Sequence, residues 1–326
     1  MQTSVIICTH NPRENYLRRV LQAIESQTLP KEKWELLLID NGSSKPLASE
    51  WNLSWQPNAR HIREEELGLT PARIRGIREA HGENLIFVDD DNVLAEDYLS
   101  VALDLLEVHP WIGALGGSTI GEFEVPPESW WEGRLENLAI LDVKKEAWAC
   151  LAGMAGLDLF TPCGAGMVIR RNIAAGWAET ISKDPLKLGL GRKGNSLTGY
   201  DDTDMVLFVC SKGLSIGRFP QLSLKHLIPR RRLQKDYFIK LTEGNATSCA
   251  ILQYVREGII PNLSTETTPP CLSERVFLSY KKFRAILRNV KLVDPFEEEL
   301  QKARFRGKQK AFQIIEEHKN TIKTGR

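Results

Sequence analysis

Apolar residues along the first hundred positions follow two alternating periods. Short runs rich in Val, Ile and Leu are each followed by a longer segment in which apolar residues recur every three or four positions, as at Leu17, Val20 and Leu21. The short runs predict strands and the longer segments predict amphipathic helices. We expect strands at 4–9, 34–40, 59–65 and 84–90, and helices at 15–27, 70–82 and 95–109. This alternation predicts an α/β fold with a mixed, mostly parallel sheet flanked by helices.

The pattern loosens after about residue 110. We expect a strand at 115–123, a helix after the paired tryptophans within 126–141, a buried strand entering a helix within 161–171, a loop entering a helix at 199–213, and short strands at 214–229. A long helical stretch begins near Arg231. The sequence therefore predicts an α/β domain at 1–230 and a helical C-terminal region at 231–326.

Composition adds constraints on the class of protein. The chain has 326 residues, of which 42% are apolar and 26% charged, and this balance is ordinary for a globular protein. Its formal net charge of +1 argues against general attraction to nucleic acid. The six cysteines are scattered without a CxxC pair, which favours reduced thiols in a cytoplasm over a disulfide framework or a zinc site. Neither a secretory signal nor a membrane span is expected.

Charge is unevenly distributed along the chain. Residues 272–326 carry 14 Lys and Arg against 7 Asp and Glu, so the rest of the chain has an excess of acids. Segment 275–290 predicts a helix with one apolar stripe and with its basic residues away from that stripe. Such a helix can lie on an anionic membrane, or it can pack on the body of the protein or on a second subunit. The sequence leaves these alternatives open.

Polar residues end three of the predicted strands. Thr9 ends the first strand, Asp40 ends the second, and the run Asp89–Asp91 ends the fourth. Because ligands of such sheets bind at the carboxyl ends of the strands, we expect these residues near one crevice.

The run Asp89–Asp91 has two interpretations. Acids that precede a helix satisfy its first N–H groups and favour its dipole, so the run can cap the helix expected at 95–109. One residue suffices as a cap, however, and three adjacent carboxylates repel one another. A divalent cation such as Mn²⁺ or Mg²⁺ prefers hard oxygen ligands and offsets that repulsion, typically in phosphate chemistry.

Four segments together resemble the family 2 glycosyltransferases of bacterial type, which have the Rossmann-like GT-A fold. The segments are SVIICTHNPRENYLRRVLQAIESQ, ELLLIDNGSS, GLTPARIRGIREAHGENLIFVDDDN and GYDDTDMVLFVCSKG. The resemblance implies metal-dependent, inverting transfer of a sugar from a nucleoside-diphosphate sugar, with UDP the expected nucleotide, to a hydroxyl of a glycan or lipid-linked acceptor. It also implies that 1–230 is a GT-A catalytic domain, with a nucleotide-sugar-binding half at 1–110 and an acceptor-binding half at 111–230.

The same resemblance assigns roles on the donor side. Asp89 and Asp91 match the ends of the metal-binding Asp-x-Asp motif, and Asp91 is the expected direct ligand of Mn²⁺ or Mg²⁺. Asp89 or Asp90 is expected to face the ribose or sugar of the donor. Thr9 and Asn11 match positions that line the nucleoside pocket.

Two further donor contacts follow from position in the family pattern. Asp40 matches the acid that faces the base, and Arg73 matches the arginine near the diphosphate, although Ile74 stands where the family usually has asparagine. Taken alone, the sequence around Asp40 is that of a plain Asx turn, and an arginine on a surface helix usually faces solvent.

The second acidic cluster, Asp201, Asp202 and Asp204, opens the helix expected at 199–213. The family commonly has Glu-Asp-x-Asp here, so the resemblance makes Asp202 the general base and places Asp201 where the glutamate usually stands. Inverting transfer needs a base, because the acceptor hydroxyl attacks the anomeric carbon opposite the leaving nucleoside diphosphate and must lose its proton. Helix capping is the alternative.

Three more side chains are candidate site residues, and each has an alternative role in the core of the protein. His226 lies where family members often place a histidine after the base helix, so it is a candidate metal ligand or phosphate contact, or else a satisfied core histidine. Trp130 and Trp131 lie where acceptor loops occur in this fold, and they either stack on a sugar or belong to the core. The arginines at 230–232 either reach the diphosphate or face water.

Other functions fit the sequence less well. A sugar nucleotidyltransferase is expected to have a Gly-rich loop with Arg after the first strand, and a phosphatase of the haloacid dehalogenase type is expected to have its nucleophile there. Here that strand ends in Cys8 and Thr9. A catalytically silent nucleotide-sugar-binding scaffold protein is the alternative that is not an enzyme. We expect a cytoplasmic enzyme of polysaccharide or glycolipid assembly, peripheral at the inner face of the cell membrane if the basic segment binds lipid, and we leave a homodimer open.

Overall fold

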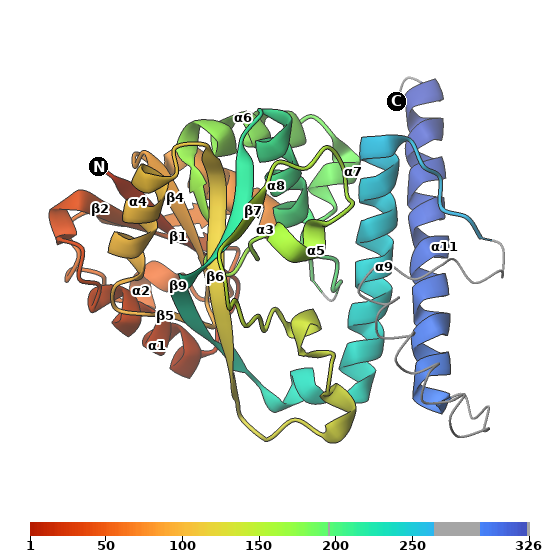
Figure 1. The fold of residues 1–326 in the computed structure, drawn as a ribbon, viewed down its shortest axis with the longest axis horizontal. Helices are drawn as coiled ribbons and strands as arrows, with labels where there is room; N and C mark the ends of the chain where they lie inside the picture. The colour runs from red at the N-terminus through yellow and green to blue at the C-terminus, as the bar shows by residue number, and fades with distance from the viewer. Residues whose placement is uncertain (195, 264–293, 325–326) are drawn as a thin grey trace.

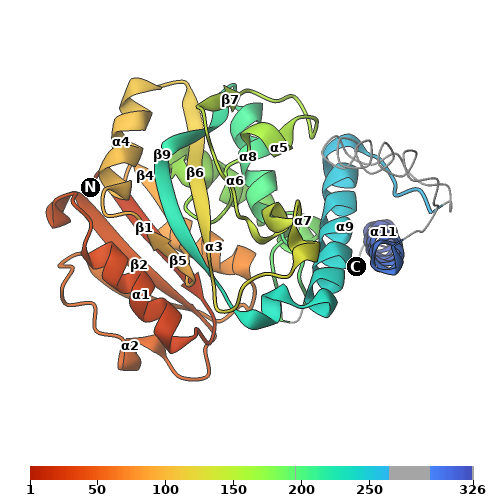
Figure 2. The same cartoon turned by 60° about the horizontal axis from the view of Figure 1, so that its bottom comes forward.

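The computed structural model describes residues 1–194, 196–263 and 294–324. Figure 1 shows a twisted sheet with helices on both faces and two long helices, α9 (Lys235–Glu257) and α11 (Pro295–Thr324), side by side at one end. The view in Figure 2 shows the same pairing of α9 with α11. The expected mixed sheet with flanking helices and a helical C-terminal extension is therefore confirmed.

Within the described residues, nine strands form one sheet in the order β3-β2-β1-β4-β8-β6-β9-β5, and β7 also pairs with β9. Their bounds are β1 Thr3–Thr9, β2 Trp34–Asn41, β3 Ala59–Glu64, β4 Asn84–Asp89, β5 Asn92–Leu94, β6 Ile112–Phe123, β7 Ala147–Ala149, β8 Val168–Arg170 and β9 Ser215–Ile228. Strands β1, β2, β3, β4, β6 and β9 run in one direction, while β5, β7 and β8 run in the other.

Successive residues of the central strands enter two apolar layers, because side chains of a strand point alternately to its two faces. Val5 and Ile7 of β1 pack under α1 (Glu14–Glu25) and α4 (Tyr98–Val108). Ile6, between them, packs on the opposite face, under α3 (Leu69–Glu79), α6 (Arg171–Ile181) and α8 (Asp201–Ser211). Each fully buried Val or Ile contributes about 1.5–3 kcal/mol, so register in the sheet is strongly fixed. The short helices are α2 Leu47–Glu50, α5 Leu157–Phe160 and α7 Pro185–Leu188.

Two predictions for the middle of the chain were wrong. The helix expected after the paired tryptophans is replaced by two 3₁₀ turns, Ser129–Trp131 and Leu135–Leu138. Gly133, with φ of 71°, separates these turns, because a left-handed residue cannot continue a right-handed helix. The short strands expected at 214–229 form the single 14-residue strand β9. Its register against β6 shifts around Pro220, which has no N–H to donate to the ladder.

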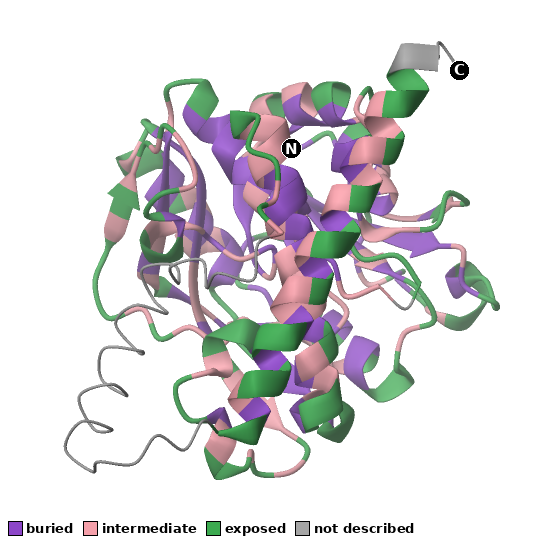
Figure 3. Cartoon of the chain, turned by 90° about the vertical axis from the view of Figure 1, so that its right-hand side faces the viewer, coloured by how far each residue is buried: buried purple, intermediate pink, exposed green. Residues whose placement is uncertain are grey.

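The C-terminal helices close a third apolar cluster. Trp131, Phe238 of α9 and Phe296 of α11 are among its buried members, so the cluster joins these helices to the loop after β6. Figure 3 shows exposed and half-buried residues on the side of α11 that faces the viewer, with most of the buried residues behind it. Segment 275–290, the predicted basic amphipathic helix, lies outside the described residues. Among the residues that are described, no helix is long and apolar enough to cross a membrane.

Candidate active site

The carboxyl ends of β1, β2 and β4 lie side by side. In the parallel ladder Thr9 pairs with Asp40, and Cys8 pairs with Asp89. The residues that the sequence placed at three strand ends are therefore neighbours at one edge of the sheet, where ligands of parallel sheets bind.

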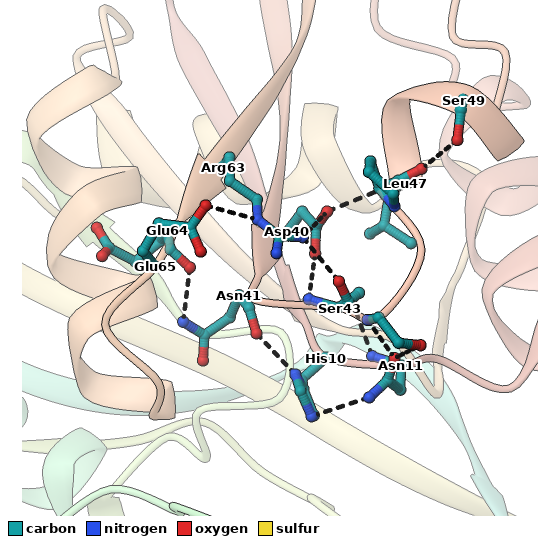
Figure 4. A network of polar contacts seen from close by, with 12 residues as sticks. His10, Asn11, Asp40, Asn41, Ser43, Leu47, Ser49, Arg63, Glu64 and Glu65 are labelled. Atoms are coloured by element: carbon teal, nitrogen blue, oxygen red, sulfur yellow. Dashed lines mark hydrogen bonds and ion pairs between the residues drawn. The ribbon is translucent and has the colours of Figure 1, made fainter.

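Asp40 fixes the turn that follows β2 (Figure 4). Its Oδ1 accepts from the Ser43 N–H at 2.9 Å, and its Oδ2 accepts from the Leu47 N–H at 3.1 Å and from Arg63 Nη1 at 2.8 Å. Burial alone would raise the pKa of Asp40, but these hydrogen bonds hold that pKa below its ordinary value. The carboxylate thus has the local role expected of an Asx turn, and contact with a base stays a prediction.

Asn11 joins the loop after β1 to the loop after β2 (Figure 4). Its backbone is left-handed, with φ of 48°, a conformation that asparagine tolerates. The Asn11 N–H donates to Ser43 Oγ at 2.9 Å, and its Oδ1 accepts from the N–H and Oγ of Ser44, both at 2.9 Å. These bonds give the predicted nucleoside side of the site a fixed backbone.

The run Asp89–Asp91 does not cap a helix. β4 ends at Asp89, β5 begins at Asn92, and α4 begins only at Tyr98. The capping interpretation is therefore wrong, because a strand separates the acids from the helix. The side chain of Asp89 is 38% exposed, whereas that of Asp91 is 8% exposed.

Asp90 lies between these two acids and is half-buried. Burial raises the pKa of Asp90 to about 7, and the charges of Asp91 and Asp89 act in the same direction. Thr9 Oγ1 donates a short hydrogen bond to Asp90 Oδ2, which opposes the increase. Negative charge is thus incompletely balanced at this strand end, and a proton or a cation would relieve it.

Asp91 is held by one side chain from β9 and one from the 3₁₀ turn that follows it. Arg232 Nη2 lies 3.0 Å from Asp91 Oδ2, and His226 Nε2 lies 3.5 Å from Asp91 Oδ1. Burial alone would raise the pKa of Asp91, but the neighbouring His226 and Arg232 hold it well below its usual range. Asp91 is consequently an anion that is already paired with the Arg232 guanidinium.

The donor atoms around Asp91 fit a divalent cation in kind, and they are few. A carboxylate oxygen and an imidazole nitrogen are suitable ligands for Mn²⁺, and Mg²⁺ is often held by only one or two carboxylates with phosphate oxygens and water. Among residues 1–194, 196–263 and 294–324, no three His, Cys, Asp or Glu side chains are grouped as a metal site. The protein's share of such a site would be Asp91 and His226.

Arg73 connects the two acidic clusters. Its side chain is 4% exposed, with Nη1 2.8 Å from Asp201 Oδ2 and Nη2 3.8 Å from Asp89 Oδ1. The alternative of a solvent-facing arginine is therefore wrong. The contact with Asp89 places Arg73 beside the predicted donor motif, and its contact with the diphosphate stays a prediction.

Asp202 lies at the start of α8, beside this ion pair. Its Oδ2 accepts from the Gly164 N–H at 2.9 Å, and its Oδ1 accepts from the Thr203 N–H at 2.7 Å. Burial raises the pKa of Asp202, and the charge of Asp201 raises it further. The N-cap residue of α8 is Tyr200, without a side-chain capping bond, so capping does not explain the cluster.

Asp204 faces away from Asp202 and into the protein. Trp177 Nε1 donates to Asp204 Oδ2 at 2.9 Å, and Arg256 Nε donates to Asp204 Oδ1 at 2.8 Å. Lys187 Nζ lies 3.5 Å from the same oxygen. The third acid of the cluster thus ties α8 to α6, α7 and α9.

Of the paired tryptophans, Trp131 belongs to the core. It is 1% exposed, and its Nε1 donates to the Leu233 carbonyl at 3.0 Å. Stacking of Trp131 on an acceptor sugar is therefore excluded, as the core alternative predicted. The half-buried Trp130 packs at 4.6 Å between ring centroids on Trp131 and at 5.0 Å on Phe296, and an acceptor contact from Trp130 stays a prediction.

Comparison with known proteins points to one family. The family model described as "Glycosyl transferase family 2" matches residues 4–160. Glycosyltransferase AglE of Haloferax volcanii is 38% identical over 91 residues, which are 27% of this chain and 30% of AglE. The putative glycosyltransferase EpsH of Bacillus subtilis is 29% identical over 97 residues, which are 29% of this chain and 27% of EpsH. The chain thus spans less than a third of the length of these relatives.

Among solved structures, the chain is similar to S. aureus TarS 1–349, with a TM-score of 0.49 and 14% identity over 100% of this chain and 92% of that one. The complex of TarS 1–349 with UDP-GlcNAc gives the same TM-score and identity over 98% of this chain and 92% of that one.

Proposed function

Residues 4–160 belong to glycosyl transferase family 2, and from this premise we propose that the chain is a metal-dependent, inverting glycosyltransferase. Its donor is a nucleoside-diphosphate sugar, with UDP the expected nucleotide. Its acceptor is a hydroxyl of a glycan or of a lipid-linked sugar.

The observation that supports this proposal best is the contact between the two acidic clusters. Arg73 lies against Asp201 at the start of α8 and against Asp89 at the end of β4. Carboxylates 112 or more positions apart in the sequence are thereby held around one buried guanidinium. With the proposed roles, a donor-binding acid lies on one side of this arginine, and Asp201, the neighbour of the proposed base, lies on the other.

Asp202 is the proposed general base. In its ionised form it accepts the proton of the acceptor hydroxyl as the hydroxyl oxygen bonds to the anomeric carbon and the bond from that carbon to the diphosphate breaks. Burial and Asp201 raise the pKa of Asp202, which strengthens it as a proton acceptor. The N–H groups of Gly164 and Thr203 fix the orientation of its carboxylate.

Asp91 and His226 are the proposed protein ligands of the divalent cation, which when bound supplies positive charge to the leaving diphosphate. Arg73 adds a fixed positive charge on the side of Asp89. Thr9 holds Asp90 by its hydroxyl and so orients the middle of the acidic run.

Calorimetric titration of UDP, GDP, dTDP and CMP, each with and without Mn²⁺, tests the proposal. We expect one diphosphate to bind tightly only with metal. Asp91→Asn should weaken that metal-dependent binding, whereas Asp202→Asn should leave it nearly intact and abolish turnover of the nucleotide-sugar. Folded protein that binds none of the four nucleotides would contradict the proposal, and equal loss of binding in both variants would contradict the assignment of Asp202.

A further inference from the structure

Asp91 and His226 are held together by the backbone. His226 of β9 pairs with Asn92 across the antiparallel ladder, and the Leu227 N–H donates to the Asp91 carbonyl at 2.8 Å. The two side chains therefore project from neighbouring positions of a rigid ladder. Their facing atoms, Asp91 Oδ1 and His226 Nε2, are 3.5 Å apart. Two ligands of one small cation are about 3.0–3.5 Å apart when each is about 2.1 Å from it.

The contacts of His226 determine its tautomer. Nδ1 lies 2.9 Å from the Leu138 carbonyl, which can only accept a hydrogen bond. Nε2 lies 3.0 Å from Arg232 Nη1, which can only donate one. Both bonds form together only in the neutral ring that carries its proton on Nδ1 and presents the lone pair of Nε2. A doubly protonated ring would give up the Arg232 bond and face Asp91 Oδ1 with its Nε2–H instead. A histidine that donates from one nitrogen to a carbonyl and offers the other nitrogen is arranged as a metal ligand.

Arg232 uses both arms of its guanidinium on this pair. Nη1 reaches His226 Nε2 at 3.0 Å, and Nη2 reaches Asp91 Oδ2 at 3.0 Å. Its side chain is 16% exposed, so the contact is largely removed from solvent. Arg232 lies on the 3₁₀ turn Arg230–Leu233, which the Arg230 N–H fastens to Glu124 Oε2 at 2.9 Å.

We propose that Arg232 is an internal cation that occupies Asp91 and His226 in the metal-free protein, and that it must leave them before a divalent metal can bind. The proposal rests on the proposed function, because it takes these two residues as the metal ligands. Metal affinity is then set by a competition. The apparent dissociation constant equals the intrinsic one divided by the fraction of molecules in which the arginine has left the two ligands. The released guanidinium remains beside the site as a donor for a diphosphate oxygen.

Titration of Mn²⁺ alone, without nucleotide, tests this competition. Arg232→Gln removes the charge and keeps an amide donor, so we expect Mn²⁺ to bind roughly tenfold or more tightly than in the wild type. Arg231→Gln makes the same chemical change at an exposed position one residue away and should leave Mn²⁺ affinity unchanged. In Arg232→Gln/His226→Gln, the gain should disappear, because one of the two ligands is gone. Free Mn²⁺ measured by electron paramagnetic resonance gives the affinities directly.

Arg232→Lys is a second variant that keeps the test valid if Arg232→Gln does not fold. Lysine keeps a positive charge beside Asp91, but its single ammonium cannot bridge both partners in the way a planar guanidinium does. We expect this variant to bind Mn²⁺ more tightly than the wild type and less tightly than Arg232→Gln. Equal Mn²⁺ affinity in all three proteins, or a gain that survives the loss of His226, would overturn the proposal. Nucleotide binding is read separately, so a failure to bind any diphosphate would contradict the proposed function and not this competition.

Discussion

Gly164 lies where the proposed base meets Arg73. A Cβ on this residue would lie 2.5 Å from Arg73 Nη2 and 3.0 Å from Asp202 Oδ2. Both groups are oriented by contacts that leave little room to move, since Arg73 is paired with Asp201 and the Gly164 N–H holds Asp202. Arg73 and Asp202 can therefore lie this close to each other only because residue 164 has no side chain.

Gly164→Ala should therefore impair the base more than the donor site. We expect kcat to fall roughly tenfold or more, because a displaced base loses its alignment with the acceptor hydroxyl. The dissociation constant of the nucleotide should change little. Gly199→Ala is the matched control on the segment that leads into α8, since a Cβ there meets nothing within 4 Å. Steady-state kinetics with calorimetry of the nucleotide separates the two effects, and an unchanged kcat in Gly164→Ala would contradict this role.

The acids of the site could be predicted from the sequence, whereas their partners could not. Asp89 and Asp202 follow from strand and helix ends, because element boundaries fix where such residues emerge. Gly164 and Arg232 come from segments far along the chain, and only tertiary packing brings them to the acids. Gly164 has no chemical signal of its own, and Arg232 stands among three consecutive arginines that the sequence does not distinguish.

At the scale of elements, the acidic cluster at the start of α8 has two parts with different surroundings. Asp202 faces the site, while Asp204 is buried among Trp177 of α6, Lys187 of α7 and Arg256 of α9. Two positions along a helix rotate a side chain by about 200°, so Asp202 and Asp204 necessarily face opposite sides. The motif thus combines a chemical position with an anchor for the helix that carries it.

The two acids should respond differently to the same substitution. Asp204→Asn removes the charge that balances Arg256 and Lys187, and we expect the free energy of unfolding to fall by about 2–4 kcal/mol at pH 7. Asp202→Asn removes a charge that burial disfavours, so stability should be unchanged or higher. Urea unfolding followed by circular dichroism measures both. Equal destabilisation of the two variants would contradict this difference, and an unchanged free energy of unfolding in Asp204→Asn would show that Asp204 is not the anchor.

The main α/β alternation of the first hundred residues was predicted correctly because the apolar period and the turn residues agree there, whereas the short elements α2 and β5 were missed. Prediction failed at 126–141, where buried Trp131 and Leu138 imitate helical spacing but Gly133 and Ala139 adopt left-handed backbone. It also failed for β9, because its pairing with β6 continues past the register shift at Pro220. Both errors arise from contacts that are not local in the sequence.

For the whole molecule, buried carboxylates act on stability in two separate pH ranges. The pKa values of Glu35, Asp40 and Asp91 are lowered in the folded protein, so their stabilising contributions are present above about pH 4 and are lost as the pH falls below it. The pKa of Asp90 is raised from 3.8 to about 7, and that of Asp202 is raised as well. Their contributions are complete below about pH 4 and are lost as the pH rises.

The free energy of unfolding of the metal-free protein should consequently peak near pH 4–5 and decline towards pH 7, because over that range the folded state binds more protons at Asp90 than the unfolded state does. Asp90→Asn removes the group that takes up this proton and should flatten the decline. Asp142→Asn, at a side chain that is 73% exposed, is the control and should keep the wild-type profile. Urea unfolding in EDTA at intervals from pH 4 to pH 8 gives the profiles. Parallel profiles for the wild type and Asp90→Asn would show that proton uptake at Asp90 does not cause the decline in the free energy of unfolding.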